Sequence, residues 1–240
     1  MSTRMSEFKY VGSELELFAG VRNWKTYWSS QIRPYIAGDV LEVGAGMGAN
    51  TAYLNGGNTR RWVCLEPDPL LAAQLSSNLE QTKIQTGCEV VGGTLQTLQE
   101  SQFDTIIYID VLEHIENDKK ELEQAVRFLR PGGRIIVLSP AHQSLFTEFD
   151  TAIGHFRRYD RRMLQSISPS DLRLEKLWYL DSVGLLLSAA NRHLLRQSML
   201  TKAQLRFWDQ VVVPASRVLD KCLFGSVGKS IVGIWRRDHL

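Results

Sequence analysis

The stretch VLEVGAGMGANT, residues 40–51, decides the fold. Its first residues are apolar or acidic, and glycine then occupies every second position from Gly44 to Gly48. A buried strand, a tight glycine turn and a helix start together bring backbone N–H groups close to a bound ligand, because glycine has no side chain to hold the backbone away. The stretch therefore predicts a nucleotide-type cofactor at this turn. Two large families of α/β enzymes have nearly the same letters here.

Short apolar runs alternate with helical patterns along the rest of the chain. Such alternation is typical of a mostly parallel sheet whose strands are buried on both faces. Strands are predicted over 39–43, 61–66, 88–91, 103–110, 134–140, 172–180 and 229–237. Helices are predicted over 20–36, from 48, from Asp68, between 118 and 130, and over 161–167. We expect Asp118 and Glu121 to form a capping box and Pro131-Gly132-Gly133 to end that helix.

Residues 181–224 lie between the last two predicted strands and are expected to form two helices. Apolar residues repeat at steps of three and four from Val183 to Leu195 and from Leu205 to Cys222. Pro214 should kink the second helix, since proline lacks the N–H that a helix interior requires. We expect both stripes to pack against the sheet or each other. The alternative is a face for a partner or a membrane.

Length and composition limit the class of protein. A chain of 240 residues with 44% apolar and 22% charged residues predicts one well-buried globular domain. Its 28 basic and 26 acidic residues are too balanced to indicate a nucleic-acid partner. The three cysteines are far apart and form no CxxC pair, which favours a reducing compartment. We expect a cytoplasmic protein without a transmembrane segment, and peripheral contact with a membrane stays compatible with the sequence.

Three features resemble motifs of the class I S-adenosylmethionine-dependent methyltransferases. Gly44, Gly46 and Ala49 also fit the dinucleotide fingerprint, so an NAD(P)-dependent oxidoreductase is the alternative. However, Glu42 and Gly48 extend the turn to E-x-G-x-G-x-G, which resembles motif I of the methyltransferases. The stretch YIDVLEHIEND at 108–118, followed by LRPGGRIIVLSP at 129–140, resembles their later motifs and has no counterpart in dehydrogenases.

The resemblance implies a Rossmann-like α/β fold. Its sheet would have seven mostly parallel strands in the order 3-2-1-4-5-7-6, with helices on both faces and a helical insert between strands 6 and 7. The chain would be one methyltransferase domain over 1–240. Its parts would be an N-terminal helical cap at 1–37, a cofactor-binding core at 38–180, the insert as a lid at 181–224, and the last strand within 225–240.

S-adenosylmethionine is the cofactor that the resemblance implies, with S-adenosylhomocysteine as the product. Glu66, at the end of the second strand, would accept from both ribose hydroxyls. Residues 92–94 lack the acidic residue that many relatives use for adenine, so this role falls to backbone groups and Leu95. The expected cofactor contacts are Glu42, Gly44, Ala45, Gly46, Gly48, Thr51, Glu66, Pro67, Thr94, Leu95, Asp110 and Val111.

A narrower resemblance rests on the pattern D-x-x-x-G-H-x-R-R-Y. Its residues here are Asp150, Gly154, His155, Arg157, Arg158 and Tyr159, and they resemble a bacterial group of methyltransferases. The implied enzyme methylates a small molecule, with a hydroxyl or carboxylate oxygen favoured and an anionic, lipidic or secondary-metabolite acceptor. A binding protein for S-adenosylmethionine without catalysis is a further alternative. We expect no nucleic-acid partner and a monomer or homodimer.

Three histidines are candidates for a general base, which a hydroxyl acceptor would need. They are His114, His142 and His155, and they follow strands at the edge where open α/β sheets bind ligands. Each is alternatively a structural hydrogen-bonding group. Asp110, Glu113 and His114 also resemble the E-x-x-E-H metal site of some ubiquinone-pathway O-methyltransferases. Because Asp replaces the first Glu, we assign no metal.

Acceptor binding is expected near the arginines of the same segment. Four arginines lie within residues 157–162, and guanidinium groups bind carboxylates or phosphates bidentately. The alternative is that Arg157 or Arg158 pairs with Asp150 or Asp160 and fixes the loop. The expected acceptor contacts are Tyr27, His142, His155, Arg157, Arg158 and Tyr159.

Overall fold

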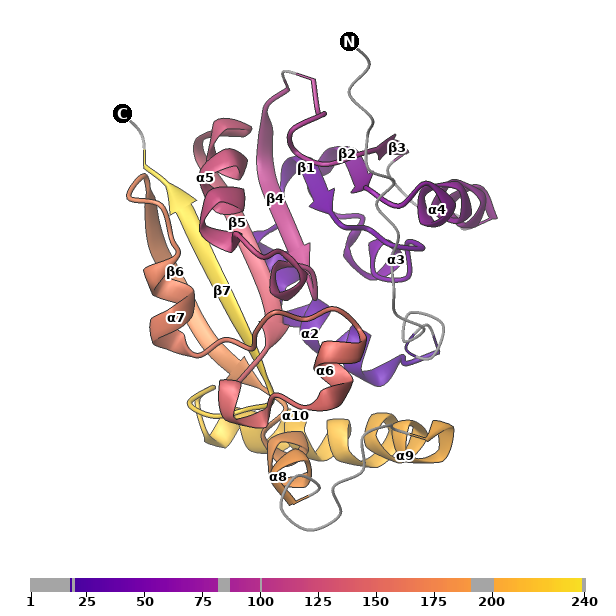
Figure 1. Ribbon diagram of the computed structural model, residues 1–240, viewed down its shortest axis with the longest axis vertical. Coiled ribbons are helices and arrows are strands. Elements are labelled where there is room, and N and C mark those ends of the chain that lie inside the picture. Colours follow the sequence, from indigo (N-terminus) through magenta and orange to yellow (C-terminus); the bar gives the residue numbers. More distant parts are fainter. Residues whose placement is uncertain (1–17, 19, 82–86, 100, 191–200, 239–240) are drawn as a thin grey trace.

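The structure is a computed structural model that describes residues 18, 20–81, 87–99, 101–190 and 201–238. Seven strands form one sheet in the order β3-β2-β1-β4-β5-β7-β6, which confirms the expected topology (Figure 1). Strand β7 runs antiparallel to both of its neighbours, and the other pairs are parallel. The strands are β1 Gly38–Val43, β2 Thr59–Glu66, β3 Cys88–Gly92, β4 Phe103–Ile109, β5 Leu129–Pro140, β6 Leu172–Leu180 and β7 Ser230–Arg237.

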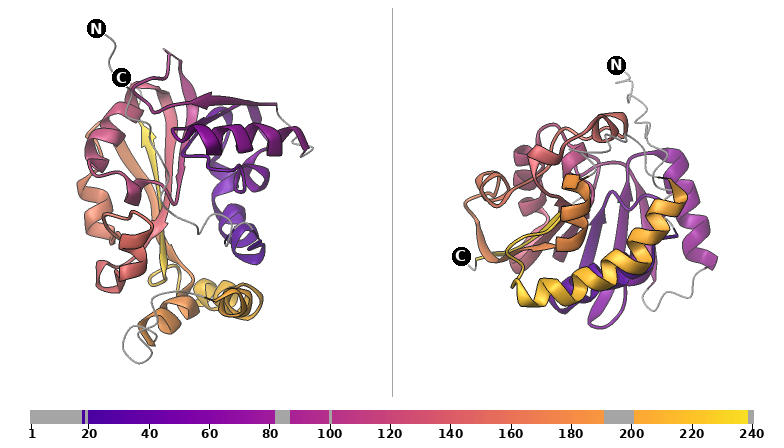
Figure 2. Two further views of the ribbon diagram at one scale, coloured as in Figure 1. Left: turned by 45° about the vertical axis from the view of Figure 1, so that its right-hand side comes forward. Right: turned by 90° about the horizontal axis from the view of Figure 1, so that it is seen from below.

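Helices cover both faces of this sheet (Figure 2). On one face, α2 and α4 pack on the side chains that include Val40 and Trp62. On the other face, α5 and α7 pack on those that include Leu41 and Val63. Neighbouring residues of one strand point to opposite faces, so buried strands need apolar side chains at every position. The helices are α2 Asn23–Ile32, α3 Thr51–Leu54, α4 Pro69–Gln81, α5 Asp118–Arg127, α6 Glu148–Ala152 and α7 Arg161–Ser166.

Two local expectations were wrong. The N-cap of α5 is Asn117, whose side chain accepts from the backbone N–H of Lys120, and Glu121 instead accepts from the Tyr108 hydroxyl. The segment Pro131–Gly133 does not end the helix, because the helix ends at Arg127 and this segment belongs to the irregular start of β5. A Cβ at Gly133 would lie 2.9 Å from the Arg130 carbonyl oxygen, so glycine permits the close approach there.

The insert between β6 and β7 contains α8 Ser182–Ala190, followed after the undescribed residues 191–200 by one long helix. This helix comprises α9 Lys202–Phe207, a π-helical turn Trp208–Val212 and α10 Val213–Cys222. The backbone N–H of Val213 donates to the Trp208 carbonyl, five residues earlier. Pro214 cannot donate and crowds the preceding turn, so the wider π turn replaces the expected kink.

Three buried aspartates hold the insert to the domain. Asp209 accepts from the backbone N–H of Trp24 at 2.9 Å and so caps the start of α2. Asp220 accepts from the Tyr27 hydroxyl and from the backbone N–H of Asp181, both at 2.8 Å. Asp181 in turn accepts from Trp208 Nε1 at 2.8 Å. All three carboxylates therefore accept hydrogen bonds inside the protein, and none of them lies on the outer face of the insert.

Candidate active site

Four strands leave the sheet through a residue with a left-handed backbone, all at the same edge. These residues are Gly44 after β1, Asp110 after β4, His142 after β5 and Asp181 after β6, with φ of 65°, 53°, 66° and 66°. Positive φ is uncommon outside glycine and is concentrated at functional sites. This edge is also where open α/β sheets bind their ligands. The expected site residues that follow these strands therefore lie at this one edge of the sheet.

The glycine turn is held against its neighbours by short contacts. The N–H groups of Gly44 and Ala45 donate to the Leu65 carbonyl at 2.8 and 3.2 Å. A Cβ on Gly44 would lie 2.7 Å from Val111 Cγ2, and a Cβ on Gly48 would lie 2.6 Å from Leu75 Cδ1. The turn therefore requires glycine for its backbone conformation and for its packing.

Glu42 and Thr51 hold this turn through buried hydrogen bonds. Glu42 Oε2 accepts from Thr51 Oγ1 at 2.8 Å and from Trp62 Nε1 at 2.9 Å. Burial raises the pKa of Glu42 to about 7, against these hydrogen bonds, which favour the charged form. Glu42 is 2% exposed and Thr51 is 0% exposed, so their hydrogen bond holds the turn from inside the protein. Direct contact of Glu42 and Thr51 with the cofactor stays a prediction.

Glu66 ties the end of β2 to the turn. Its carboxylate accepts from the N–H of Gly46 at 2.8 Å and from the N–H of Asp68 at 3.0 Å, and burial raises its pKa. The adjacent Pro67 is half-buried. Beyond β3, Thr94 is exposed, whereas the Leu95 side chain is buried in the core. At Leu95 itself, therefore, the backbone groups and not the side chain are available to a ligand.

The helix that follows the turn is shorter than expected. It begins at Thr51 and ends at Leu54, four residues in all, whereas the sequence predicted a start near residue 48. The Gly48 N–H donates to the Ala45 carbonyl within the turn itself. A ligand in this region would therefore meet the backbone of the loop and the charged side chains beside it. A helix of four residues adds little dipole.

Lys25 of α2 is a site residue that the sequence analysis missed. Its Nζ donates to the Ala49 carbonyl at 3.3 Å, at the end of the glycine turn, and the side chain is buried. Burial lowers the pKa of Lys25 to about 8, and the nearby Asp110 and Asp209 partly oppose this. Residue 25 falls on the apolar face that Val21, Trp24 and Trp28 define. A charge within a predicted buried stripe was therefore the signal that could have identified it.

Asp110, directly after β4, interacts electrostatically with Lys25. Its side chain is exposed, yet desolvation by the surrounding protein raises its pKa to about 6, and the positive charges of Lys229 and Lys25 partly oppose this shift. Lys229, at the start of β7, was also missed, and burial lowers its pKa. One carboxyl group accessible to a ligand thus lies between two lysines at the edge of the sheet.

This set of groups fits S-adenosylmethionine by its chemistry. A carboxylate at the end of β2 suits the ribose diol, which donates hydrogen bonds. An acidic group, Asp110, suits the α-ammonium group, and a cation, Lys25, suits the carboxylate of the methionine part. The glycine turn between them lets the backbone approach the ligand closely.

His155 is joined to Asp150 in a buried pair. His155 Nδ1 lies 3.0 Å from Asp150 Oδ1, and the imidazole is 9% exposed. A carboxylate only accepts, so Nδ1 carries the proton and Nε2 keeps its lone pair. The neighbouring His114 ring lies edge-on to His155 at 4.5 Å between centroids, and desolvation lowers its pKa to about 4. His114 is therefore neutral at physiological pH.

Glu113 faces the same imidazole. Its Oε2 accepts from Ser139 Oγ at 2.9 Å, while Oε1 is buried without a hydrogen-bond partner, 3.9 Å from His155 Nε2. Burial and the adjacent Asp110 raise the pKa of Glu113 well above its usual range. Glu113, His114 and His155 place potential ligand atoms within 4.8 Å of one another, a spacing that a metal ion could use.

His142 takes a different arrangement from the other two histidines. Its ring stacks on Tyr179 at 5.0 Å between centroids, and its Nε2 lies 3.0 Å from the Gly228 carbonyl. A carbonyl accepts, so Nε2 carries the proton and Nδ1 keeps the lone pair. His142 therefore lies at the site edge but apart from the His114 and His155 pair.

The arginines of the pattern are paired within the protein. Arg158 binds Asp150 bidentately, with Nε at 2.8 Å and Nη2 at 2.9 Å. Arg157 pairs with Asp118 and donates to the carbonyls of Ile115 and Glu116. These contacts favour the alternative in which the arginines fix the loop. The Arg158–Asp150 pair is one of the expected pairs, whereas Arg157 pairs with Asp118, which was not expected.

Two expected acceptor contacts are also used internally. Tyr159 is 0% exposed and donates to Asp118 Oδ2 at 2.8 Å. Tyr27 is 4% exposed and donates to Asp220. Each tyrosine hydroxyl already donates its one proton to a buried aspartate, so neither is left to donate to an acceptor, against the expectation for both. Of the expected acceptor contacts, His142 and His155 remain at the site.

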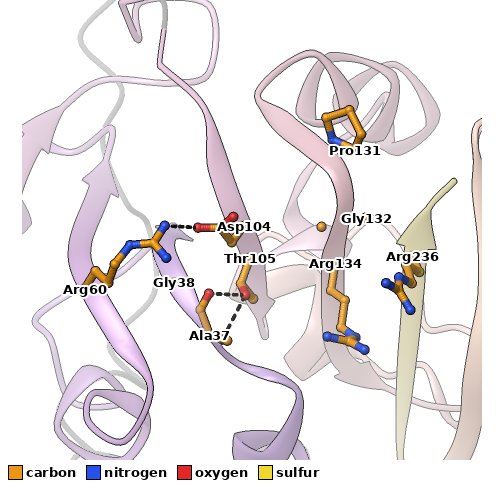
Figure 3. Close-up of a pocket in the computed structure, with 10 residues that line it drawn as sticks. Ala37, Gly38, Arg60, Asp104, Thr105, Pro131, Gly132, Arg134 and Arg236 are labelled. Carbon is orange, nitrogen blue, oxygen red and sulfur yellow. Dashed lines mark hydrogen bonds and ion pairs between the residues drawn. The ribbon is translucent and has the colours of Figure 1, made fainter. Parts of the chain in front are cut away.

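A hollow of about 300 Å³ lies at the opposite edge of the sheet (Figure 3). Arg60 and Asp104 line it and form an ion pair at 2.7 Å, and Arg134 pairs with Glu175 at 2.7 Å. Because its charges are neutralised by one another and it is far from the carboxyl ends of the parallel strands, we assign no ligand to it.

Comparisons with known proteins agree with this geometry. Residues 41–137 match the family model described as a methyltransferase domain. A norajmaline N-methyltransferase of Rauvolfia serpentina is 23% identical over 109 residues, which cover 45% of this chain and 37% of that protein. A thiol S-methyltransferase of Mus musculus is 28% identical over 138 residues, which cover 55% and 52%. The chain thus spans about half or less of the curated relatives that it matches.

Solved structures extend the likeness to most of the chain. An S-adenosylmethionine-dependent methyltransferase of Clostridium acetobutylicum matches with a TM-score of 0.59 at 10% identity, over 94% of this chain and 96% of that one. The [4+2]-cyclase SpnF matches with a TM-score of 0.62 at 12% identity, over 95% of both chains. At such identities the likeness establishes the fold. Residues 41–137 therefore match the methyltransferase-domain family, within a chain that shares its fold with solved S-adenosylmethionine-dependent methyltransferases, and S-adenosylmethionine is the cofactor that this match indicates.

Proposed function

We propose that this protein transfers the methyl group of S-adenosylmethionine to a small-molecule acceptor in the cytoplasm. The observation that carries the proposal is the set of charged groups around the glycine turn: Glu66, Asp110 and Lys25. These groups match the diol, ammonium and carboxylate of the cofactor. An NAD(P)-dependent enzyme would need groups for a pyrophosphate, and a carboxylate at the position of Asp110 would repel it.

S-adenosylmethionine, when bound, supplies an electrophilic methyl group on a sulfonium centre. The protein's main task is then to hold the acceptor in line at near-attack distance. Asp110 and Glu113 follow β4, and His142 follows β5, so the acceptor would lie beyond these strand ends. An oxygen acceptor, either a hydroxyl or a carboxylate, suits this region, which offers hydrogen-bonding groups and a neutral His114.

We propose His155 as the general base for a hydroxyl acceptor. Asp150 fixes the proton on Nδ1, so the lone pair on Nε2 is available to take the proton of the acceptor. As that proton arrives, the imidazole becomes a cation beside the carboxylate of Asp150, which stabilises it. Burial and the adjacent Asp110 raise the pKa of Glu113, which favours its uncharged form beside Nε2. His142 is the second candidate, with Nδ1 as its basic nitrogen.

The insert is proposed to limit access to the acceptor. It starts at Asp181, directly after β6, and Lys229 follows it at the start of β7, so both of its ends lie at the edge of the sheet that carries the site. An apolar wall from this insert would suit a lipidic or secondary-metabolite acceptor. Neither a nucleic-acid acceptor nor a further subunit is part of this proposal.

Calorimetry against S-adenosylhomocysteine and against NAD and NADP tests the cofactor. We expect binding of S-adenosylhomocysteine alone, and Asp110→Asn should weaken it about tenfold through the lost ammonium contact. Asp238→Asn, on an exposed side chain at the opposite edge, is the matched control and should bind normally. Selective binding of NAD or NADP would refute the assignment.

Turnover is tested with a panel of small hydroxyl and carboxyl compounds, by following the release of S-adenosylhomocysteine. Methylation of at least one compound is expected, with product confirmed by mass spectrometry. Tight cofactor binding with no turnover on any of them would instead favour the alternative, a binding protein without catalysis.

A further inference from the structure

The exposed apolar side chains of the protein are concentrated on the insert. Among the described residues, ten large apolar side chains are exposed, and eight of them lie between Leu186 and Val227. Phe207, Val218 and Phe224 are 55%, 68% and 91% exposed. Apolar side chains gathered on one surface mark contact sites, whereas scattered ones need no explanation.

Exposed apolar residues and exposed basic residues are neighbours along the long helix 202–222, and we call them the apolar row and the basic row. The apolar row consists of Ala203, Phe207, Val211, Val218 and Cys222, all of them exposed. Four exposed basic residues each directly precede a member of this row: Lys202, Arg206, Arg217 and Lys221. Positions four apart share one side of an α-helix, so Lys202 and Arg206 lie beside Ala203 and Phe207 on α9, and Arg217 and Lys221 lie beside Val218 and Cys222 on α10.

The outer face of this helix carries no acidic side chain. Residues 181–224 contain six Lys and Arg residues and only three acidic residues. Those three are Asp181, Asp209 and Asp220, which are at most 8% exposed and accept hydrogen bonds inside the protein. Every outward charge on the described part of the insert is therefore positive.

We propose that this face attaches the protein to the surface of a membrane that contains anionic phospholipid. A helix with an apolar face and a basic polar face lies in the plane of the membrane interface, where the apolar side chains enter the boundary of the acyl chains. The basic row meets the anionic headgroups. No described helix is long and apolar enough to cross a bilayer, so the contact is with one surface only.

A second copy of the chain fits this face less well. A symmetric dimer places the same patch of both copies in contact, which would bring two basic rows together without an acidic partner. Nucleic acid would satisfy the basic row but would leave Phe207 and Val218 against a charged backbone. The membrane interface accepts both rows, because it places acyl chains directly below anionic headgroups. The inference is independent of the proposed enzymatic function.

Flotation of the purified full chain with lipid vesicles tests the proposal. Vesicles of phosphatidylcholine alone should bind weakly, and vesicles of equal parts phosphatidylcholine and phosphatidylglycerol should bind strongly, with binding reduced by added salt. Replacing two basic side chains, in Arg206→Gln/Lys221→Gln, should weaken binding to the anionic vesicles about 25-fold, at about fivefold for each charge. Phe207→Ser should weaken it about tenfold or more.

Matched variants on other surfaces provide the controls. Lys119→Gln/Lys120→Gln removes two exposed charges from α5, and Leu70→Ser removes a side chain that is 70% exposed on α4. Both should bind vesicles like the unchanged protein. All substituted residues are exposed, and thermal melts would verify that each variant is folded.

Three results would overturn the proposal. They are an absence of binding to anionic vesicles, an equal loss of binding in the control variants, and equal binding to neutral and anionic vesicles. Light scattering adds a separate criterion. A stable dimer that Phe207→Ser converts to monomer would assign the face to a second copy of the chain.

Discussion

His155 and Asp150 form a buried hydrogen-bonded pair, with 3.0 Å between Nδ1 and Oδ1. The same carboxylate binds Arg158 bidentately and accepts from the backbone N–H and the hydroxyl of Thr147 at the start of α6. These bonds hold the pKa of Asp150 below its usual range even though burial acts the other way. Asp150 therefore stays charged and fixes the orientation of the His155 ring.

Replacing His155 tests its role as the base. His155→Gln should lower the turnover number about 10²- to 10⁴-fold, as the loss of a general base does. The affinity for S-adenosylhomocysteine should change less than twofold, because His155 lies on the acceptor side. His142→Gln is the comparison. A large loss in that variant, with normal turnover in His155→Gln, would transfer the role to His142.

Lys25 should make cofactor binding depend on pH. Its pKa is about 8, so the ammonium group loses its proton between pH 7 and pH 9.5. If it pairs with the cofactor carboxylate, the affinity for S-adenosylhomocysteine should fall about five- to tenfold over this range, as measured by calorimetry. Lys25→Met should bind weakly at both pH values. The probe 5′-methylthioadenosine lacks the carboxylate and should bind both proteins equally, and a matching loss with that probe would contradict the pairing.

Glu42 should make the stability of the protein fall with rising pH. Its pKa is about 7 in the folded protein and 4.5 in the unfolded chain, so the folded state binds the proton more tightly. The stabilisation is complete below pH 4.5 and is lost as pH rises through 7, by about 3 kcal/mol in all. Urea unfolding of the wild type and of Glu42→Gln should show a flatter pH dependence in the variant. Parallel curves would contradict this assignment.

Gly44 and Gly57 separate backbone strain from steric contact. Both have positive φ, 65° and 69°, but a Cβ would meet Val111 only at Gly44, with open space at Gly57. Gly57→Ala should cost about 1 kcal/mol in the free energy of unfolding. Gly44→Ala should cost about 2 to 4 kcal/mol and should also weaken S-adenosylhomocysteine binding. Equal costs in the two variants would mean that the Val111 contact relaxes freely.

The sheet could be predicted from the sequence because its strands carry strong signals. The apolar runs from 61 to 66 and from 172 to 180 lie within or match observed strands, and the strand order came from the resemblance carried by Gly48 and the stretch 108–118. Periodicity also located the long helix of the insert. Its π turn was not predictable from periodicity, because the widening depends on how Pro214 and the buried Asp209 are accommodated together.

The site could be predicted only in part, because side-chain pairing is a property of the folded chain. The sequence predicted that Asp110, His114 and His155 follow strands at the binding edge of the sheet, and the structure has them in the loops after β4 and β5. It could not establish that Arg158 uses its fork on Asp150, or that Tyr27 donates to Asp220, 193 positions later in the chain. Lys25 was missed because it belongs to a helix that the cofactor motifs do not include.

Helix α2 contacts both the glycine turn and the helical insert. One side of it touches the cofactor turn through Lys25 and Ala49, and the other side holds the insert through Tyr27 and Asp220. The start of the same helix is capped by Asp209, which belongs to the long outer helix. Any shift of α2 that accompanies a filled cofactor turn would also displace the outer helix. Thermodynamic linkage then requires reciprocity. If the cofactor changes the affinity of the outer helix for a membrane surface, binding to that surface changes the affinity for the cofactor by the same factor.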